Sequence, residues 1–143
     1  MDKSTPSPIE TYRLDAQIGF KLRLANQRHL EVFSRVLPQT TPTQLAVLAK
    51  LLEVGDVSQN HLGRMVGMDA ATTKGVVDRL QKKRLLVVTP SQVDRRRLVI
   101  CLSKQGHELI ADMIPSAIEA SRQTTANLTN RESARLVELL DKL

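Results

Sequence analysis

The sequence contains very few aromatic residues and a single cysteine. Among its 143 residues, only Tyr12, Phe20 and Phe33 are aromatic, and tryptophan is absent. Proteins that bind single-stranded nucleic acid stack its bases on several aromatic rings, so an RNA-recognition sheet is disfavoured. Cys101 has no second cysteine with which to form an internal disulfide.

Metal-ligand clusters, catalytic motifs and long apolar runs are also missing. The three histidines, His29, His61 and His107, are scattered singly, so we expect neither a metal site nor a cofactor. An enzyme using Cys101 and His107 as nucleophile and base is an alternative, but Cys101 alternates with apolar neighbours as a buried residue does. No segment approaches the roughly 18 apolar residues that span a bilayer, and the N-terminus lacks a secretion signal. We therefore expect a cytoplasmic protein that makes no membrane contact.

Positive charge is concentrated in one third of the chain. The formal net charge is +6. Residues 58–104 contain ten lysines and arginines against three aspartates, which leaves the remaining residues close to neutral. This distribution is typical of a surface that meets a polyanion. A solvated, charged face is the alternative unless a motif accompanies the charge.

The spacing of apolar residues, caps and helix breakers predicts a mainly helical protein. We expect a mobile tail at 1–8, followed by one long helix from Ile9 to Leu37 that Pro38 ends. Further helices are predicted from the Thr41 capping box to Gly55, from Ser58 to Gly67, from Asp69 to about Arg84, from Ser103 to about Asn127 with a kink at Pro115, and after the Thr129 capping box.

A β-hairpin is predicted between these helices. Its strands are the β-rich runs at 85–89 and 98–102, which flank an arginine-rich turn. The two helices on either side of Gly67 form a helix-turn-helix pattern, and the hairpin makes it a winged helix. We expect a single domain at 9–143, with a DNA-binding winged helix-turn-helix at 42–102 and dimerisation helices at 9–38 and 103–143.

The second helix of the pair begins with small and polar residues that fit a major groove, although such residues also open ordinary exposed helices. Three arginines at a hairpin tip repel one another unless an anion lies between them. An arginine on a thin hairpin suits the narrow and strongly negative minor groove. An exposed hairpin kept soluble by its arginines is the alternative. The predicted DNA-binding residues are Ser58, Arg64, Ala70, Thr72, Thr73, Lys74, Arg79, Lys82, Lys83, Asp94, Arg95, Arg96 and Arg97.

These segments together resemble the winged helix-turn-helix of the MarR family of bacterial transcriptional regulators. The resemblance lies in 62–69, in 72–80, in Asp94-Arg95-Arg96 and in the Leu-Ser-x-x-Gly of 102–106. It implies a homodimer whose first, fifth and sixth helices interlock and whose two lobes grip a pseudo-palindromic operator in double-stranded DNA. It also implies that Asp94 orients the wing while Arg96 enters the minor groove. One departure is Arg84, where the family usually has glycine, and a positive φ there would cost about 1 kcal/mol.

The family resemblance further implies release from DNA by a small aromatic acid. Residues 12–19 and 25–29 resemble repressors of nicotinic acid degradation that respond to a hydroxylated pyridine carboxylate. His29 continues an apolar stripe of the first long helix, and Asn26 and Arg23 precede it by about one and two turns, where they can bond a carboxylate. We therefore predict effector contacts by Arg23, Asn26 and His29, with 6-hydroxynicotinate as an example of the effector. A histidine satisfied at a helix–helix interface is the alternative.

Two further functions stay open on the sequence alone. One is a redox-sensing MarR-type regulator that acts through Cys101, although relatives of that kind typically carry their cysteine in the first long helix. The other is a winged-helix module that binds proteins, in which case binding would depend little on salt.

Overall fold

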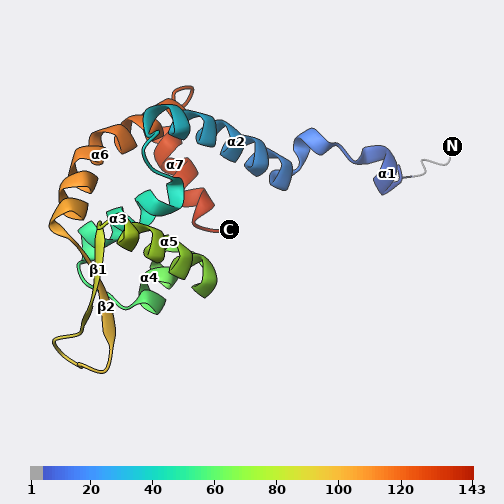
Figure 1. Ribbon diagram of the computed structural model, residues 1–143. Helices are drawn as coiled ribbons and strands as arrows, with labels where there is room; N and C mark the ends of the chain where they lie inside the picture. Colours follow the sequence, from blue (N-terminus) through green and yellow to red (C-terminus); the bar gives the residue numbers. More distant parts are fainter. Residues whose placement is uncertain (1–4) are drawn as a thin grey trace.

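The computed structural model describes residues 5–143, which form a mainly helical fold with one β-hairpin, as predicted (Figure 1). None of the helices in this part of the chain is long and apolar enough to cross a membrane. The elements are α1 (Pro8–Thr11), the 3-10 helix η1 (Leu14–Ala16), α2 (Ile18–Val36), α3 (Pro42–Val54), α4 (Gln59–Val66), α5 (Ala70–Lys82), β1 (Leu86–Pro90), β2 (Leu98–Leu102), α6 (Lys104–Thr124) and α7 (Asn130–Leu140).

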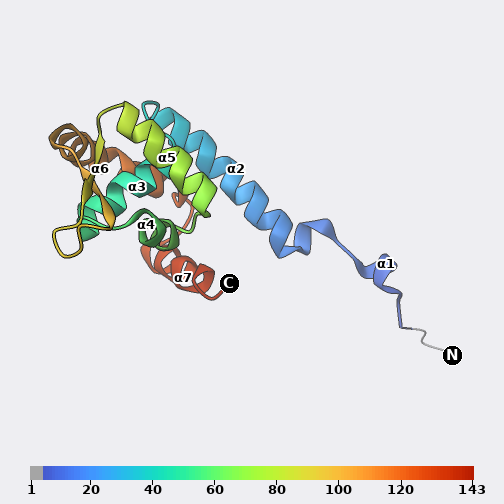
Figure 2. The same ribbon diagram turned by 60° about the horizontal axis from the view of Figure 1, so that its bottom comes forward.

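The prediction of one helix from 9 to 37 is wrong, because this segment is broken into α1, η1 and α2. A capping box at Ser7 starts α1, which ends after a single turn at Tyr12, and Tyr12, Arg13 and Gln17 all have extended backbones. Residues 9–16 are all exposed, so no packing offsets the cost of forming a continuous helix there. In both views α1 lies at the far end of an arm that leads away from the rest of the chain (Figures 1 and 2).

The predicted tail at 1–8 and the predicted domain start at Ile9 are affected by the same break. Residues 1–4 lie outside the described residues. Ser7 and Pro8 are part of the first helical turn, because the Ser7 hydroxyl accepts the N–H of Glu10 while the Glu10 carboxylate accepts the N–H of Ser7. The helical segment therefore begins at Pro8.

The later helices begin at the predicted caps. The side chains of Ser58, Asp69 and Thr129 each accept the N–H of the residue three positions further on. Gly55 and Gly67 end α3 and α4 with φ of 81° and 69°, values that a side chain disfavours. Helix α5 ends two residues before the predicted Arg84, and α6 ends three residues before the predicted Asn127. Helix α6 continues through Pro115 and follows a curved path (Figure 1).

Strands β1 and β2 pair antiparallel, with Leu86 opposite Leu102 and Pro90 opposite Leu98. The hairpin they form with the loop at 91–97 is called the wing below. Ile100 also exchanges backbone hydrogen bonds with Val57, of 2.7 and 3.3 Å, which attaches β2 to the segment that leads into α4. The wing loop thus projects beyond the helices from an anchored base (Figure 1).

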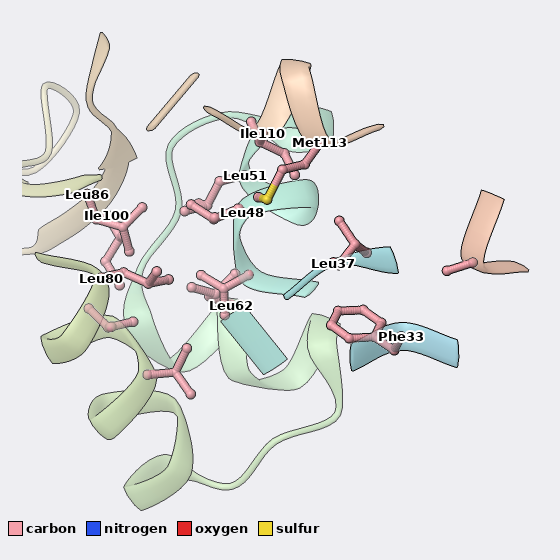
Figure 3. Close-up of a cluster of buried hydrophobic side chains, with 14 residues drawn as sticks. Phe33, Leu37, Leu48, Leu51, Leu62, Leu80, Leu86, Ile100, Ile110 and Met113 are labelled. Atoms are coloured by element: carbon pink, nitrogen blue, oxygen red, sulfur yellow. The ribbon is translucent and has the colours of Figure 1, made fainter. Parts of the chain in front are cut away.

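The hydrophobic core holds α5 and the wing against α3, α4 and α6. It includes Leu48, Leu62, Leu80 and Ile100, which come from four different elements and are almost completely buried (Figure 3). Burial of side chains of this size contributes roughly 1.5–3 kcal/mol each. The rotation of α5 about its own axis is therefore fixed by the core.

Helices α2, α6 and α7 leave apolar side chains exposed. Helix α2 packs against α6, yet Ile18 on α2 and Ile118 on α6 remain 66% and 65% exposed. On α7, Leu136, Val137, Leu139 and Leu140 are all exposed. A short helix cannot bury such a face by itself, so these helices need a further packing partner.

Candidate nucleic-acid interface

The start of α5 is presented to solvent because the opposite face of the helix is buried. Val76, Val77 and Leu80 pack into the core, whereas Ala70, Thr72 and Lys74 are exposed. Asp69 Oδ1 accepts the N–H of Thr72 at 2.7 Å, and this hydrogen bond lowers the pKa of Asp69. The cap therefore stays ionised at neutral pH and fixes the first turn of α5.

Thr73 is a correction to the predicted interface. Its side chain is only 1% exposed, and its hydroxyl donates to the carbonyl oxygen of Asp69 at 2.7 Å. It faces Gly63 on α4, so it packs the helix pair together and is not available to a groove. The apolar period of α5 places residue 73 on the same side as Val76, Val77 and Leu80.

The predicted basic residues of α4, of α5 and of its C-cap are exposed, and two of them have partners within the protein. Lys74 Nζ lies 2.9 Å from Asp78 Oδ2, one helical turn away. Lys83 Nζ donates to Gln44 Oε1 at 3.4 Å. The capping box predicted at Thr41 is therefore only half formed: the Thr41 hydroxyl accepts the N–H of Gln44, but the Gln44 side chain bonds to Lys83 and not to the N–H of Thr41. Arg64, Arg79 and Lys82 are exposed on the same helices.

The wing tip is a hydrogen-bonded turn that presents its arginines outward. Ser91 Oγ accepts the N–H groups of Val93 and Asp94 at 3.2 and 3.4 Å. Asp94 Oδ1 accepts the N–H of Arg96 at 3.1 Å, and Asp94 Oδ2 lies 3.9 Å from Arg97 Nε. Asp94 thus shapes the turn and faces one arginine, while Arg95, Arg96 and Arg97 are all exposed.

Two concave surfaces lie between these parts. One, of about 210 Å³, lies between α4 and the start of α5 and is lined by Arg64 together with Met68 and Ala70. The other, of about 460 Å³, lies between α4 and the wing and is lined by Ser58, Arg64 and Arg97. Both are also lined by Gln59 and Asn60. These two amides are not among the residues predicted from the sequence, although their place directly after the Ser58 cap marks them as first-turn residues.

The predicted effector residues all lie on α2, in different surroundings. His29 is half-buried; its Nδ1 lies 2.8 Å from Thr124 Oγ1 at the end of α6, and its ring meets Phe33 edge-on with centroids 6.1 Å apart. The Thr124 hydroxyl donates to the carbonyl oxygen of Ala120, so His29 Nδ1 carries the proton of the shared bond and Nε2 is left to accept or donate. The Arg23 guanidinium lies over the Phe20 ring at 5.5 Å, and Asn26 is exposed.

A mainly apolar cavity lies close to His29. It has a volume of about 350 Å³ where α2 meets α3, and Phe33, which touches the His29 ring, is one of its lining residues. Leu30 and Ser34 line it from α2, and residues 37, 38 and 40–42 close it from the end of α2 to the start of α3. Arg23, Asn26 and His29 do not line it, and His29 is related to it through the edge-on contact of its ring with Phe33.

The part of the chain that the structure describes contains no group of three or more histidine, cysteine or acidic residues placed to hold a metal ion. Cys101 is partly buried, with its Sγ 3.6 Å from Thr89 Oγ1. Burial raises the pKa of the Cys101 thiol.

Comparison with known proteins identifies this geometry. The model of the MarR family matches residues 39–97, which include the helix pair and most of the wing. The HTH-type transcriptional repressor NicR of Pseudomonas putida is 34% identical over 99% of this chain and 93% of its own length. The chain belongs to the MarR family. Proteins of this family are dimeric transcriptional regulators, and they are not enzymes.

Solved structures agree with this assignment. The crystal structure of a probable transcriptional regulator from Pseudomonas aeruginosa is 44% identical, with a TM-score of 0.84 over 91% of this chain and 98% of that one. Bordetella bronchiseptica BpsR, whose DNA binding is regulated by 6-hydroxynicotinic acid, is 33% identical, with a TM-score of 0.87 over 92% and 95%. The winged helix-turn-helix predicted from the sequence is confirmed by these likenesses.

Proposed function

We propose that two copies of this chain repress transcription by occupying a pseudo-palindromic operator in cytoplasmic DNA. Each α5 would enter a major groove, and each wing would place Arg96 in the flanking minor groove. One observation carries the proposal. The basic 58–104 segment contains the exposed start of α5, the α4 surface around Arg64 and the wing arginines, and the elements that present them are anchored to one core. The exposed faces of α2, α6 and α7 are where the second copy would pack.

The DNA part of the proposal is tested by salt dependence and by two variants. Because each phosphate contact releases counterions, the logarithm of the affinity for duplex DNA should fall with the logarithm of salt concentration by about 0.9 per contact. Arg96→Ala should weaken binding by about 1–3 kcal/mol and relax selectivity at the bases it reads, whereas Lys82→Ala should weaken binding to all sequences alike. A flat salt dependence would favour the protein-binding module instead.

We further propose that a small aromatic carboxylate, with 6-hydroxynicotinate as the first candidate, weakens operator binding. The support is the position of His29 at the contact between α2 and α6, where its Nδ1 is used by Thr124 and its Nε2 points away from that bond. The next residue of α2, Leu30, lines the mainly apolar cavity. Arg23 and Asn26 supply a cation and an amide on the same helix. The likeness to BpsR supports the choice of ligand.

The effector is tested by titrating 6-hydroxynicotinate into the protein bound to a labelled operator duplex. We expect the apparent affinity for DNA to fall as ligand is added, because a ligand that prefers the unbound form shifts the equilibrium by its differential affinity. His29→Ala should reduce this response. His107→Ala, which changes an exposed histidine in the first turn of α6, serves as the control. An unchanged affinity in the parent protein would reject this effector and leave the DNA proposal standing.

A further inference from the structure

The end of α5, the helix proposed to enter the major groove, and the start of α6 are joined through one side chain, that of Ser103. Its hydroxyl donates a hydrogen bond to the carbonyl oxygen of Arg84 at 2.6 Å and accepts the N–H of Gly106 at 2.9 Å. The backbone N–H of Ser103 donates to the carbonyl oxygen of Leu85 at 3.0 Å. Two hydrogen bonds from Ser103 therefore hold residues 84–85 against the first turn of α6.

Residues 84–85 are in turn fixed to α5. The N–H of Arg84 donates to Gln81 at 2.9 Å, and the N–H of Leu85 donates to Leu80 at 3.0 Å. This pair of hydrogen bonds is typical of a helix end at which the residue after the C-cap adopts a left-handed backbone. That residue is usually glycine. Arg84 adopts it with φ of 60°, and it is the only non-glycine residue of 5–143 with a positive φ. The strained backbone aims the Arg84 carbonyl oxygen at Ser103.

Gly106 allows this close approach. A Cβ atom at residue 106 would collide with the carbonyl oxygen of Leu85, and Gly106 itself is buried. The cap of α6 and the end of α5 therefore occupy one tightly packed junction. Ser103 is the side chain that bonds to both.

We propose that Ser103 is a positioning residue for DNA recognition, because its hydroxyl bond to Arg84 sets the orientation of α5 and the wing base relative to α6. The proposal rests on the proposed function. Helix α6 packs on α2, and these helices would form the dimer, so the tilt of α5 against α6 decides whether both recognition helices fit grooves about 34 Å apart. Helix α5 is about 20 Å long, so a tilt of about 10° at the junction moves its groove-facing start by about 3 Å.

The test separates the Ser103–Arg84 bond from helix capping. In Ser103→Asp, the carboxylate caps α6 as serine does, but it has no hydrogen to donate to the Arg84 carbonyl oxygen and repels it. Ser103→Thr keeps both hydrogen bonds and is the matched control. Gln105→Asp adds the same negative charge two residues further along the chain and leaves the junction intact. It therefore controls for a loss of DNA affinity that comes only from repulsion between the new charge and the phosphates.

The measurement is fluorescence anisotropy with two duplexes. One is selected by the parent protein from a random-sequence library, and the other is its scrambled form of equal composition. We expect the ratio of the two affinities to fall about tenfold in Ser103→Asp, a loss similar to that of one specific base contact, and to stay at the parent value in Ser103→Thr and Gln105→Asp. Thermal unfolding establishes that each variant is folded at the temperature used.

The possible failures differ. A parent protein that selects no duplex from the library overturns both this proposal and the proposed function. A parent that discriminates between the duplexes, with Ser103→Asp folded and discriminating equally well, overturns the positioning role alone. If Ser103→Asp does not fold, Ser103→Ala is measured below its unfolding temperature, and a ratio equal to that of the parent overturns the proposal in the same way.

Discussion

Gly63 of α4 and Thr73 of α5 touch at the crossing of the helix-turn-helix, where no side chain fits between them. A Cβ atom at residue 63 would lie 2.7 Å from Thr73 Oγ1 and 3.2 Å from the backbone oxygen of Met68. Gly63→Ala should therefore force the two helices apart and lower the free energy of unfolding by about 1–3 kcal/mol. Chemical denaturation monitored by circular dichroism measures this difference.

The control for this prediction is Gly75→Ala, on the opposite side of α5. A Cβ atom there would meet only Arg79 side-chain atoms, at 3.6 Å or more. Because alanine is a better helix former than glycine, Gly75→Ala should raise the free energy of unfolding by about 0.5–1 kcal/mol. Gly63→Ala with parental stability would show that the helices of the pair are not in contact as described.

Arg84→Gly should stabilise the protein. Glycine relieves the left-handed backbone at residue 84, worth about 1–2 kcal/mol, while its greater freedom in the unfolded chain cancels about 0.4–1 kcal/mol of that gain. We expect a net increase of about 0.5–1 kcal/mol in the free energy of unfolding. Arg84→Ala, which removes the charge but keeps Cβ, should give no increase. Equal gains in both variants would assign the effect to charge and not to backbone strain.

The sequence predicted local features well because they depend on neighbouring residues. The caps at Ser58, Asp69 and Thr129 and the glycine stops need only short-range hydrogen bonds and backbone freedom. The break at Tyr12 was missed because apolar spacing alone does not show whether a helix has anything to pack against. Thr73 was misplaced for a related reason: its residue type suits a groove, and only its position on the buried face of α5 decides otherwise. The amides Gln59 and Asn60 became candidates only when the fold brought them between Arg64 and the wing.

Glu119 should make the free energy of unfolding depend on pH in the acid range. Hydrogen bonds from Arg122 and then from Gln123 lower the pKa of Glu119 from its ordinary value of 4.5 to about 2. The stabilisation is complete above pH 4.5 and is lost as the pH falls from 4.5 towards 2. In Glu119→Gln the stability should therefore decline less across this window than in the parent, and Arg122→Gln should show the same flattening. Thermal unfolding at a series of pH values measures it, and identical curves would exclude this ion pair as a cause.

Cys101→Ser should leave DNA binding unchanged in the presence and absence of peroxide. The thiolate is the form that peroxide oxidises, and burial raises the pKa of the Cys101 thiol, so little thiolate is present near neutral pH. The residue also lies on β2, opposite Val87 of β1, and its neighbour Ile100 is part of the core, so a sulfenic acid there would have to form in a packed wing base. The measurement is the affinity for an operator duplex before and after treatment with hydrogen peroxide, followed by reduction with dithiothreitol. If the parent protein lost affinity reversibly and Cys101→Ser did not, the thiol would be a sensor, and redox control would replace the aromatic acid as the preferred mode of regulation.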